Sequence, residues 1–177
     1  MSWQDALASH HRLYLQPQVR YDNAMKGIPA VFIFSLLIVL PGTALAAPCK
    51  PTEPDELGPF YKPDVPVRSS VGKGYIITGM IRSSSDCSAI PGAKVEVWMA
   101  GPDGKYADAY RATLFSDSSG AFHFESHVPP VYHNRPQHIH ILVSAPGFQT
   151  LITQHYPRKG RTTAVFDLVL IPEGKKQ

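Results

Sequence analysis

Cysteine, long charged runs and helix-length amphipathic stretches are all scarce in this 177-residue sequence. Only two cysteines are present, so the chain can form at most one internal disulfide. The net charge is only +3 and no long basic run occurs, which argues against nucleic acid as a partner. Beyond residue 46, no amphipathic stretch of about 12 residues stands out, which argues against a helical domain.

Long apolar runs are equally scarce, and the one that exists lies near the N-terminus. Residues 25–46 begin with Met-Lys, continue through about 13 apolar residues at 28–40, and end in Ala-Leu-Ala. This order is typical of a secretory signal peptide, with cleavage before Ala47. A single-pass membrane anchor fits less well, because about 20 apolar residues are needed to cross a bilayer. We therefore expect the protein to be exported, either to the periplasm or out of the cell.

The predicted signal peptide divides the chain into four segments. Because a signal peptide normally starts at the initiator, we hypothesise that translation begins at Met25 and that residues 1–24 are an untranslated upstream extension. Residues 25–46 are then the signal peptide, 47–74 an extended N-terminal arm, and 75–177 the main folded domain. Signal cleavage would leave no stable membrane span. The sequence leaves the oligomeric state open, a homo-oligomer included.

The two cysteines, Cys49 and Cys87, both follow the predicted signal peptide. An even number of cysteines in an oxidising compartment favours a disulfide, which here would tie the arm to the domain body. Two free, buried thiols are the alternative. Lipidation of Cys49 fits less well, because Pro48 stands where a lipidation signal has a small residue.

The remaining pattern predicts an all-β fold. Six prolines between Pro48 and Ser70 indicate an extended arm lying over a surface. After the arm, short runs of β-branched and aromatic residues alternate with turns such as Pro91-Gly92 and Pro146-Gly147. This spacing is typical of a sandwich or barrel, and we predict an antiparallel or mixed β-sandwich. The predicted strands are 75–82, 93–99, 121–126, 138–144, 149–154 and 163–171.

His138 and His140 lie two positions apart in an apolar run that follows Arg135-Pro136. Side chains on a strand repeat every second residue, so both imidazoles would project from one face and could supply half of a metal site. Alone, the pair is equally compatible with two hydrogen-bonded strand residues. Two tyrosines in turn regions, Tyr132 six residues upstream and Tyr106 after the turn that follows Trp98, are candidates for further ligands.

Several short sequence motifs, taken together and in order, resemble those of the intradiol ring-cleavage dioxygenases, a family of non-haem iron(III) enzymes. The combination of a strand ending in Trp, a Gly-x-Tyr eight residues later, and Arg-Pro-x-His-x-His is specific. The resemblance runs from about Gly58 to Gln154. The matching words are Gly58-Pro59-Phe60-Tyr61, Ile90-Pro91-Gly92-Ala93-Lys94-Val95-Glu96-Val97-Trp98, Gly104-Lys105-Tyr106, Arg135-Pro136-Gln137-His138-Ile139-His140 and Leu151-Ile152-Thr153-Gln154.

The resemblance implies four ligands for a ferric ion, Fe(3+). Tyr106 matches the tyrosine that stays on the metal, and Tyr132 matches the tyrosine that leaves when substrate binds. His138 and His140 match the two histidine ligands. Phenolates are hard anionic donors that suit Fe(III), whereas Zn or Cu on the histidines is an alternative that tyrosinate ligands make less favourable. Tyr110 competes with Tyr106, but the gap-free match from Trp98 selects Tyr106.

The resemblance also implies an activity and two further site residues. Arg135 matches an arginine that stacks near the substrate and stabilises carbanion character, and Gln154 matches a glutamine beside the site. The implied reaction opens a catechol-type ring between its two hydroxylated carbons with O2, giving a muconate-type diacid. The alternative from another class is an exported β-sandwich module that binds carbohydrate or protein and whose metal site is idle or differently metallated.

Overall fold

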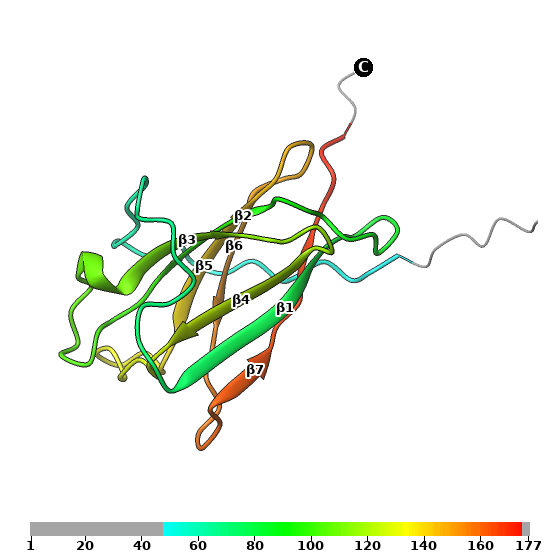
Figure 1. Ribbon diagram of the computed structural model, residues 1–177. Helices are drawn as coiled ribbons and strands as arrows, with labels where there is room; N and C mark the ends of the chain where they lie inside the picture. Colours follow the sequence, from blue (N-terminus) through cyan, green and yellow to red (C-terminus); the bar gives the residue numbers. More distant parts are fainter. Residues whose placement is uncertain (1–47, 175–177) are drawn as a thin grey trace, which may run out of the picture. The chain divides into compact units, whose positions relative to one another are not determined.

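The computed structural model describes residues 48–174 of the chain (Figure 1). The predicted upstream extension and signal peptide lie outside the described residues. Strands dominate the described part, and its one helical segment is the three-residue 3-10 helix η1 (Asp108–Tyr110). The strands are β1 (Tyr75–Ser83), β2 (Lys94–Trp98), β3 (Arg111–Phe115), β4 (Ala121–Ser126), β5 (Ile139–Ser144), β6 (Leu151–His155), β7 (Thr163–Val165) and β8 (Leu168–Leu170).

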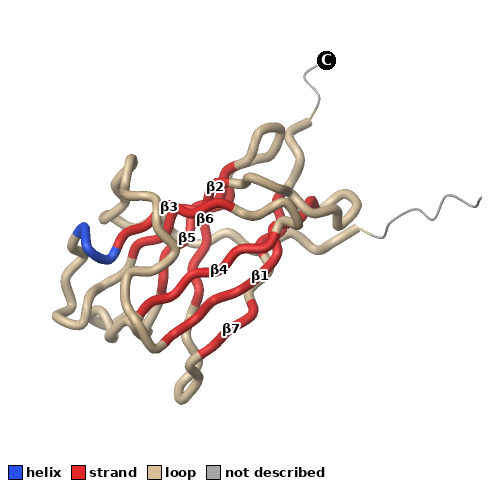
Figure 2. The backbone as a smooth tube through the Cα atoms, viewed as in Figure 1, coloured by secondary structure: helices blue, strands red, loops and turns tan. Residues whose placement is uncertain are grey.

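The strands form two four-stranded sheets, which the tube in Figure 2 shows in red. One sheet has the order β4-β1-β7, with β8 also paired to β1, and the other has the order β3-β2-β5-β6. β7 and β8 run parallel to β1, whereas all other strand pairs are antiparallel. The prediction of an all-β, mixed sandwich is confirmed.

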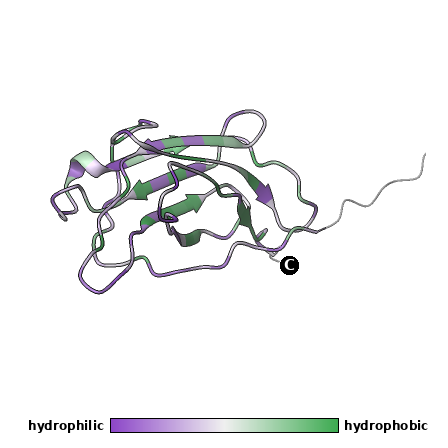
Figure 3. Ribbon diagram, turned by 90° about the horizontal axis from the view of Figure 1, so that it is seen from below, coloured by the Kyte–Doolittle hydropathy of each residue, from purple (hydrophilic) through white to green (hydrophobic). Residues whose placement is uncertain are grey.

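The core lies between the two sheets and follows from the period of two along each strand. β1 alternates buried and half-buried residues over its whole length. Its inward side chains, including Ile77 and Ile81, pack with Val95 and Ile141 of the opposite sheet. Each such side chain contributes about 1.5–3 kcal/mol when fully buried. In Figure 3 the strands carry much of the green, apolar colouring, interrupted by purple, polar stretches.

Two features of the sheets differ from the sequence-based expectation. β3 was not predicted, because its four buried residues do not alternate with exposed ones. The arm explains this pattern: it pairs with the free edge of β3 at Thr113, and the Arg111 and Thr113 side chains donate to arm carbonyls, so the outer face of β3 is covered as well. The predicted strand 163–171 is divided into β7 and β8. Between them the Asp167 carboxylate, instead of a backbone carbonyl, accepts the hydrogen bond from the Met80 N–H.

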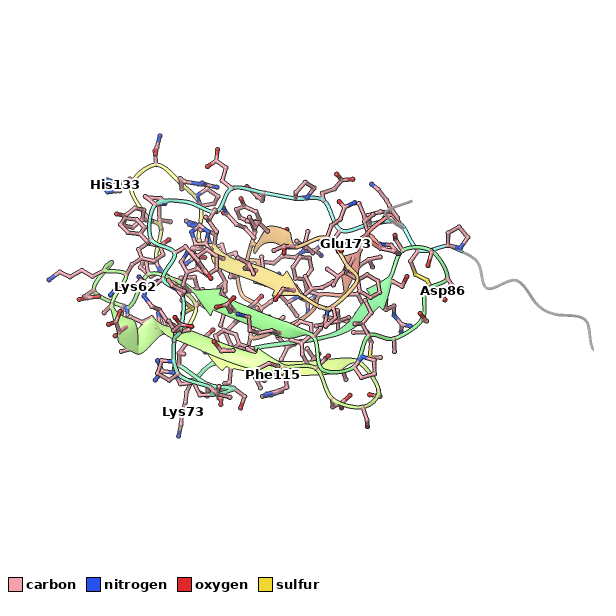
Figure 4. The ribbon with its side chains drawn as sticks, turned by 90° about the horizontal axis from the view of Figure 1, so that it is seen from above. Lys62, Lys73, Asp86, Phe115, His133 and Glu173 are labelled. Atoms are coloured by element: carbon pink, nitrogen blue, oxygen red, sulfur yellow. A yellow bond between two sulfur atoms is a disulfide. The ribbon has the colours of Figure 1, made fainter. Side chains whose placement is uncertain are left out.

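The arm, residues 48–74, contains no named strand but is bonded to both sheets. Its backbone hydrogen bonds reach β8 through Thr52 and β6 through Asp55, and later β3 and β4. Its start is fastened covalently, because Cys49 forms a disulfide with Cys87 beside the Asp86 turn (Figure 4). The arm thereby carries residues 55–61 across the outer face of the β2–β5–β6 sheet. Within residues 48–174, no helix is long and apolar enough to cross a membrane.

Candidate metal centre

Three donor atoms from two separate segments converge on the outer face of the second sheet. His138 lies immediately before β5, His140 lies within it, and Tyr106 lies in the loop between β2 and η1. The Tyr106 Oη atom is 3.1 Å from His138 Nε2 and 3.4 Å from His140 Nε2. The two imidazole rings are 4.8 Å apart, centre to centre. Both Nε2 atoms thus lie beside the same phenol, which agrees with two histidine side chains on one strand face.

These distances fit the coordination of a small metal ion. Two donors that each lie about 2.1 Å from one ion, at 90–110°, are separated by about 3.0–3.4 Å. Within the described range, histidine, cysteine, aspartate and glutamate side chains do not gather in groups of three that could hold a metal. The third donor beside the histidine pair is therefore a phenol, and a hard phenolate donor suits ferric iron.

Each histidine is held by a different contact. His138 Nδ1 donates to the Pro136 carbonyl at 2.7 Å, and because a carbonyl only accepts, the lone pair of this imidazole is on Nε2. His140 stacks on Trp98, with ring centres 4.9 Å apart and planes within 3°. Gly58 approaches His140 so closely that an added Cβ would lie 3.0 Å from its Cε1 atom. Trp98 is buried and supports a candidate ligand.

The electrostatics keep His140 and Tyr106 neutral at pH 7 in the absence of a cation. Burial, followed by the neighbouring His138, lowers the pKa of His140 to about 4, so the imidazole keeps a free lone pair at pH 7. Burial, followed by the neighbouring Tyr132, raises the pKa of Tyr106 to about 12. Without a metal the Tyr106 phenol therefore retains its proton. Metal binding would release that proton, because only the phenolate is a strong ligand.

Tyr132 lies beside the three donors but does not join their hydrogen bonds. Its ring meets Tyr106 edge-on at 5.2 Å and Phe60 edge-on at 5.7 Å. In the described part of the chain, its hydroxyl makes no hydrogen bond to Tyr106 or to either histidine. A tight turn presents it: the Arg135 N–H donates to the Tyr132 carbonyl at 2.9 Å, and His133 adopts a φ of 51°. His133 itself lies at the edge of the molecule (Figure 4).

Arg135 and Gln154 belong to one polar network that borders the donors. Arg135 donates to the Glu56 carboxylate at 2.9 Å, to Gln154 Oε1 at 3.0 Å and to the Tyr156 hydroxyl at 3.2 Å. Gln154 Nε2 donates to the Glu56 carbonyl at 2.7 Å. Gln154 is also the cross-strand neighbour of His140. The arm therefore supplies a carboxylate that orients Arg135.

Three residues of this site were missed by sequence reasoning. Phe60 stacks on Tyr106 at 4.4 Å, Glu56 pairs with Arg135, and the buried Arg111 joins two segments. The Arg111 guanidinium donates to the carbonyls of Phe60 and Tyr106, which holds the arm against the Tyr106 loop. The Gly-Pro-Phe-Tyr word in the sequence was a signal for Phe60. For Glu56 and Arg111 the sequence held no comparable signal.

The structure separates Tyr106 from its competitor Tyr110. The Tyr110 ring packs against Gly101, where any Cβ would collide with it, and meets His127 edge-on at 5.2 Å. His127 Nε2 is in turn 3.1 Å from the Ala100 carbonyl. Tyr110 thus lies in a different cluster from His138 and His140.

Comparisons with known proteins find curated relatives of this chain. No protein-family model matches the chain. The chain is 30% identical over 133 residues to a chlorocatechol 1,2-dioxygenase of Cupriavidus pinatubonensis, covering 56% of this chain and 52% of that protein. It is 32% identical over 138 residues to a catechol 1,2-dioxygenase of Candida albicans, covering 56% and 45%. The chain thus spans about half the length of the curated relatives it matches.

The fold has solved counterparts. The dioxygenase domain of a carbohydrate-binding fusion protein from Streptomyces sp. SirexAA-E superposes with a TM-score of 0.63 at 28% identity, covering 70% of this chain and all of that one. A hydroxyquinol 1,2-dioxygenase from Pseudomonas putida DLL-E4 superposes with a TM-score of 0.61 at 19% identity, covering 70% and 67%. This second likeness concerns the fold alone.

Proposed function

We infer that the chain belongs to the intradiol dioxygenase family, and on this premise we propose that it is an exported Fe(III) dioxygenase acting on catechol-type substrates. The proposed reaction cleaves the ring between the two hydroxylated carbons and adds both atoms of O2, so that a catechol becomes a muconate-type diacid. The observation that carries this proposal is the convergence of Tyr106 Oη with His138 Nε2 and His140 Nε2.

The four candidate ligands have unequal roles. Tyr106, half-buried and enclosed between Phe60 and the histidines, would stay in place as an anionic donor to bound Fe(III). Tyr132, at the side and in a turn, would hold the ion as a phenolate and, on leaving it, would accept a substrate proton. Bound Fe(III) would supply the Lewis acidity that favours the ionised, electron-rich form of the catechol toward O2.

Arg135 provides a positive charge beside this centre. Its guanidinium is fixed by Glu56, Gln154 and Tyr156, and after burial and Tyr132 its charge acts to lower the Tyr106 pKa. A fixed cation beside the ring stabilises negative charge that develops on the substrate carbon. Gln154 is a positioning residue, because it links Arg135 to the arm.

The proposal is tested with the full chain expressed and purified, using an iron assay and a visible spectrum. Wild type should hold about one iron per chain and show a tyrosinate-to-iron absorption band that shifts when catechol is added. Tyr106→Phe should lose iron and colour, whereas the matched control Tyr110→Phe should keep both. A protein that stays colourless and iron-free after reconstitution contradicts the enzyme and favours the binding-module alternative. If Tyr110→Phe removes the colour instead, the ligand assignment is wrong.

Export is tested separately by N-terminal sequencing of the secreted or periplasmic protein. The proposal requires Ala47 at the N-terminus, because the predicted signal peptide ends at residue 46. The disulfide between Cys49 and Cys87 supports export, because such bonds persist in oxidising compartments. Finding Met1 at the terminus of the purified protein contradicts both the signal peptide and the start at Met25.

A further inference from the structure

A second cavity, of about 470 Å³, lies on the other side of β6 from the candidate metal centre. It lies between β6, the edge strand of one sheet, and β7, an edge strand of the other. The lining side chains that matter here are Tyr75, His155, Arg158, Arg161, Thr163 and Phe166. No aspartate or glutamate lines it, so its wall carries only positive formal charge.

Two arginines bring this charge into the cavity from one turn. The Arg161 N–H donates to the Arg158 carbonyl at 3.0 Å, which closes the turn and sets both side chains at the same opening. Across residues 48–174, neither guanidinium has an ion pair or a side-chain hydrogen bond. A guanidinium presents a planar fork of donors that matches a carboxylate, and two unpaired forks match two carboxylates.

The floor of the cavity is a hydrogen-bonded pair, the buried Tyr75 and the half-buried His155. Tyr75 Oη is 2.7 Å from His155 Nε2, and Tyr75 is only 1% exposed. Burial, followed by the positive charge of Arg158, lowers the pKa of His155 to about 4. His155 is therefore neutral at pH 7. Arg158 lines the same cavity as His155. The floor offers no anion that would already neutralise the arginines.

We propose that this cavity binds a small dicarboxylate through Arg158 and Arg161. The class of ligand rests on the proposed function, because the diacid product of an intradiol cleavage is such a dicarboxylate. The cavity also shares Gln154 and Tyr156 with the network that fixes Arg135. The cavity binds product-class diacids outside the metal centre. A diacid bound there contacts Gln154 and Tyr156, which position Arg135.

The test is calorimetric titration of the full purified chain at low salt, with cis,cis-muconate as the probe. The double variant Arg158→Gln/Arg161→Gln should weaken binding at least about tenfold, because charge-assisted hydrogen bonds are lost. The matched control is Lys159→Gln, which removes a charge from the same turn but does not line the cavity, and it should change affinity less than about twofold. Circular dichroism melting of each variant checks that the fold is retained.

Other arms separate this site from the metal centre and from simpler anions. The iron-binding variant Tyr106→Phe should bind muconate as wild type does, even though it holds no iron. If muconate binding disappears in Tyr106→Phe, the diacid binds at the metal and the cavity proposal is overturned. Equal loss in Lys159→Gln, an unaffected double variant, no binding by wild type, or inorganic phosphate binding as tightly as muconate each overturn it too. Absence of iron or turnover in wild type, with muconate binding intact, instead overturns only the proposed function.

Discussion

Two tyrosine–histidine contacts in this molecule differ in what surrounds them. Tyr106 and His138 meet at 3.1 Å in the candidate metal centre, and Tyr75 and His155 meet at 2.7 Å at the edge of the sandwich. In both regions burial lowers a histidine pKa to about 4, for His140 in the first and His155 in the second. Only the first region adds a second imidazole within 3.4 Å of the same phenol. The comparison teaches that a shifted pKa does not mark a metal site, whereas convergent donors do.

The largest expected effect comes from removing one histidine of each region. His138→Ala should abolish iron retention, because two of the converging donors cannot hold the ion with the same affinity as three. His155→Ala should leave the iron content near that of wild type, because His155 faces the other side of β6. Metal analysis of both purified variants checks this. The comparison fails if both lose iron equally while both remain folded.

The disulfide should matter more for the metal centre than for the Arg158 cavity. Cys49→Ser/Cys87→Ser releases a closed loop of 38 residues and should lower the free energy of unfolding by about 3–4 kcal/mol in urea denaturation. The arm carries Glu56, Gly58 and Phe60 to the metal centre, so iron affinity should fall as well. No arm residue lines the cavity, and muconate affinity should therefore stay within about twofold. Equal weakening of both sites would show that the arm serves the whole fold.

Arg111 and Arg161 provide a comparison between a buried and an exposed guanidinium. Arg111→Met leaves the Phe60 and Tyr106 carbonyls without their donor and should lower the free energy of unfolding by about 2–4 kcal/mol. It should also move the absorption band of the iron-loaded protein, because the backbone of Tyr106 is no longer fixed. The control Arg161→Met should cost less than about 0.5 kcal/mol. An unmoved band with lowered stability would limit Arg111 to a structural role.

The smallest expected effect is the pH dependence of the metal-free protein. His155 has its pKa lowered from 6.5 to about 4, so between these values the unfolded chain binds a proton that the folded chain does not. Stability therefore rises with pH across this window and is lost as the pH falls through it. The slope should be at most about 1.4 kcal/mol per pH unit for each such histidine. His155→Gln should flatten the slope measured by urea denaturation at several pH values, and an unchanged slope would contradict the assignment.

Much of the sheet structure could be predicted from local pattern. β4 was predicted with its observed bounds and β1 to within one residue, because their residues alternate between core and surface. β5 was also predicted to within one residue, from its apolar run before the Pro146-Gly147 turn. β3 could not be predicted, since the arm buries its outer side and removes the alternation. The division between β7 and β8 was also hidden. It depends on Gly79, where a Cβ would collide with the Phe166 carbonyl, and on the Asp167 carboxylate that takes over one backbone hydrogen bond.

The candidate site, like the sheets, could be predicted from the sequence only in part. His138 and His140 could be paired from spacing, and Tyr106 from its match to a family word. Glu56 could not be connected to Arg135, because the two are 79 positions apart and meet only through the path of the arm. The ligand roles of all four residues stay predictions until the iron measurements are made.

The sequence by itself determined that this chain forms short strands and that two histidines share one strand face, because both follow from neighbours along the chain. Only the tertiary structure decided which phenol meets those histidines and which carboxylate holds Arg135. It also decided that His155 faces the other side of β6 from the candidate metal centre. The contacts of the phenol and of the carboxylate join residues 32 to 79 positions apart. Strand register, the disulfide and the course of the arm set such distances, and no local pattern encodes them.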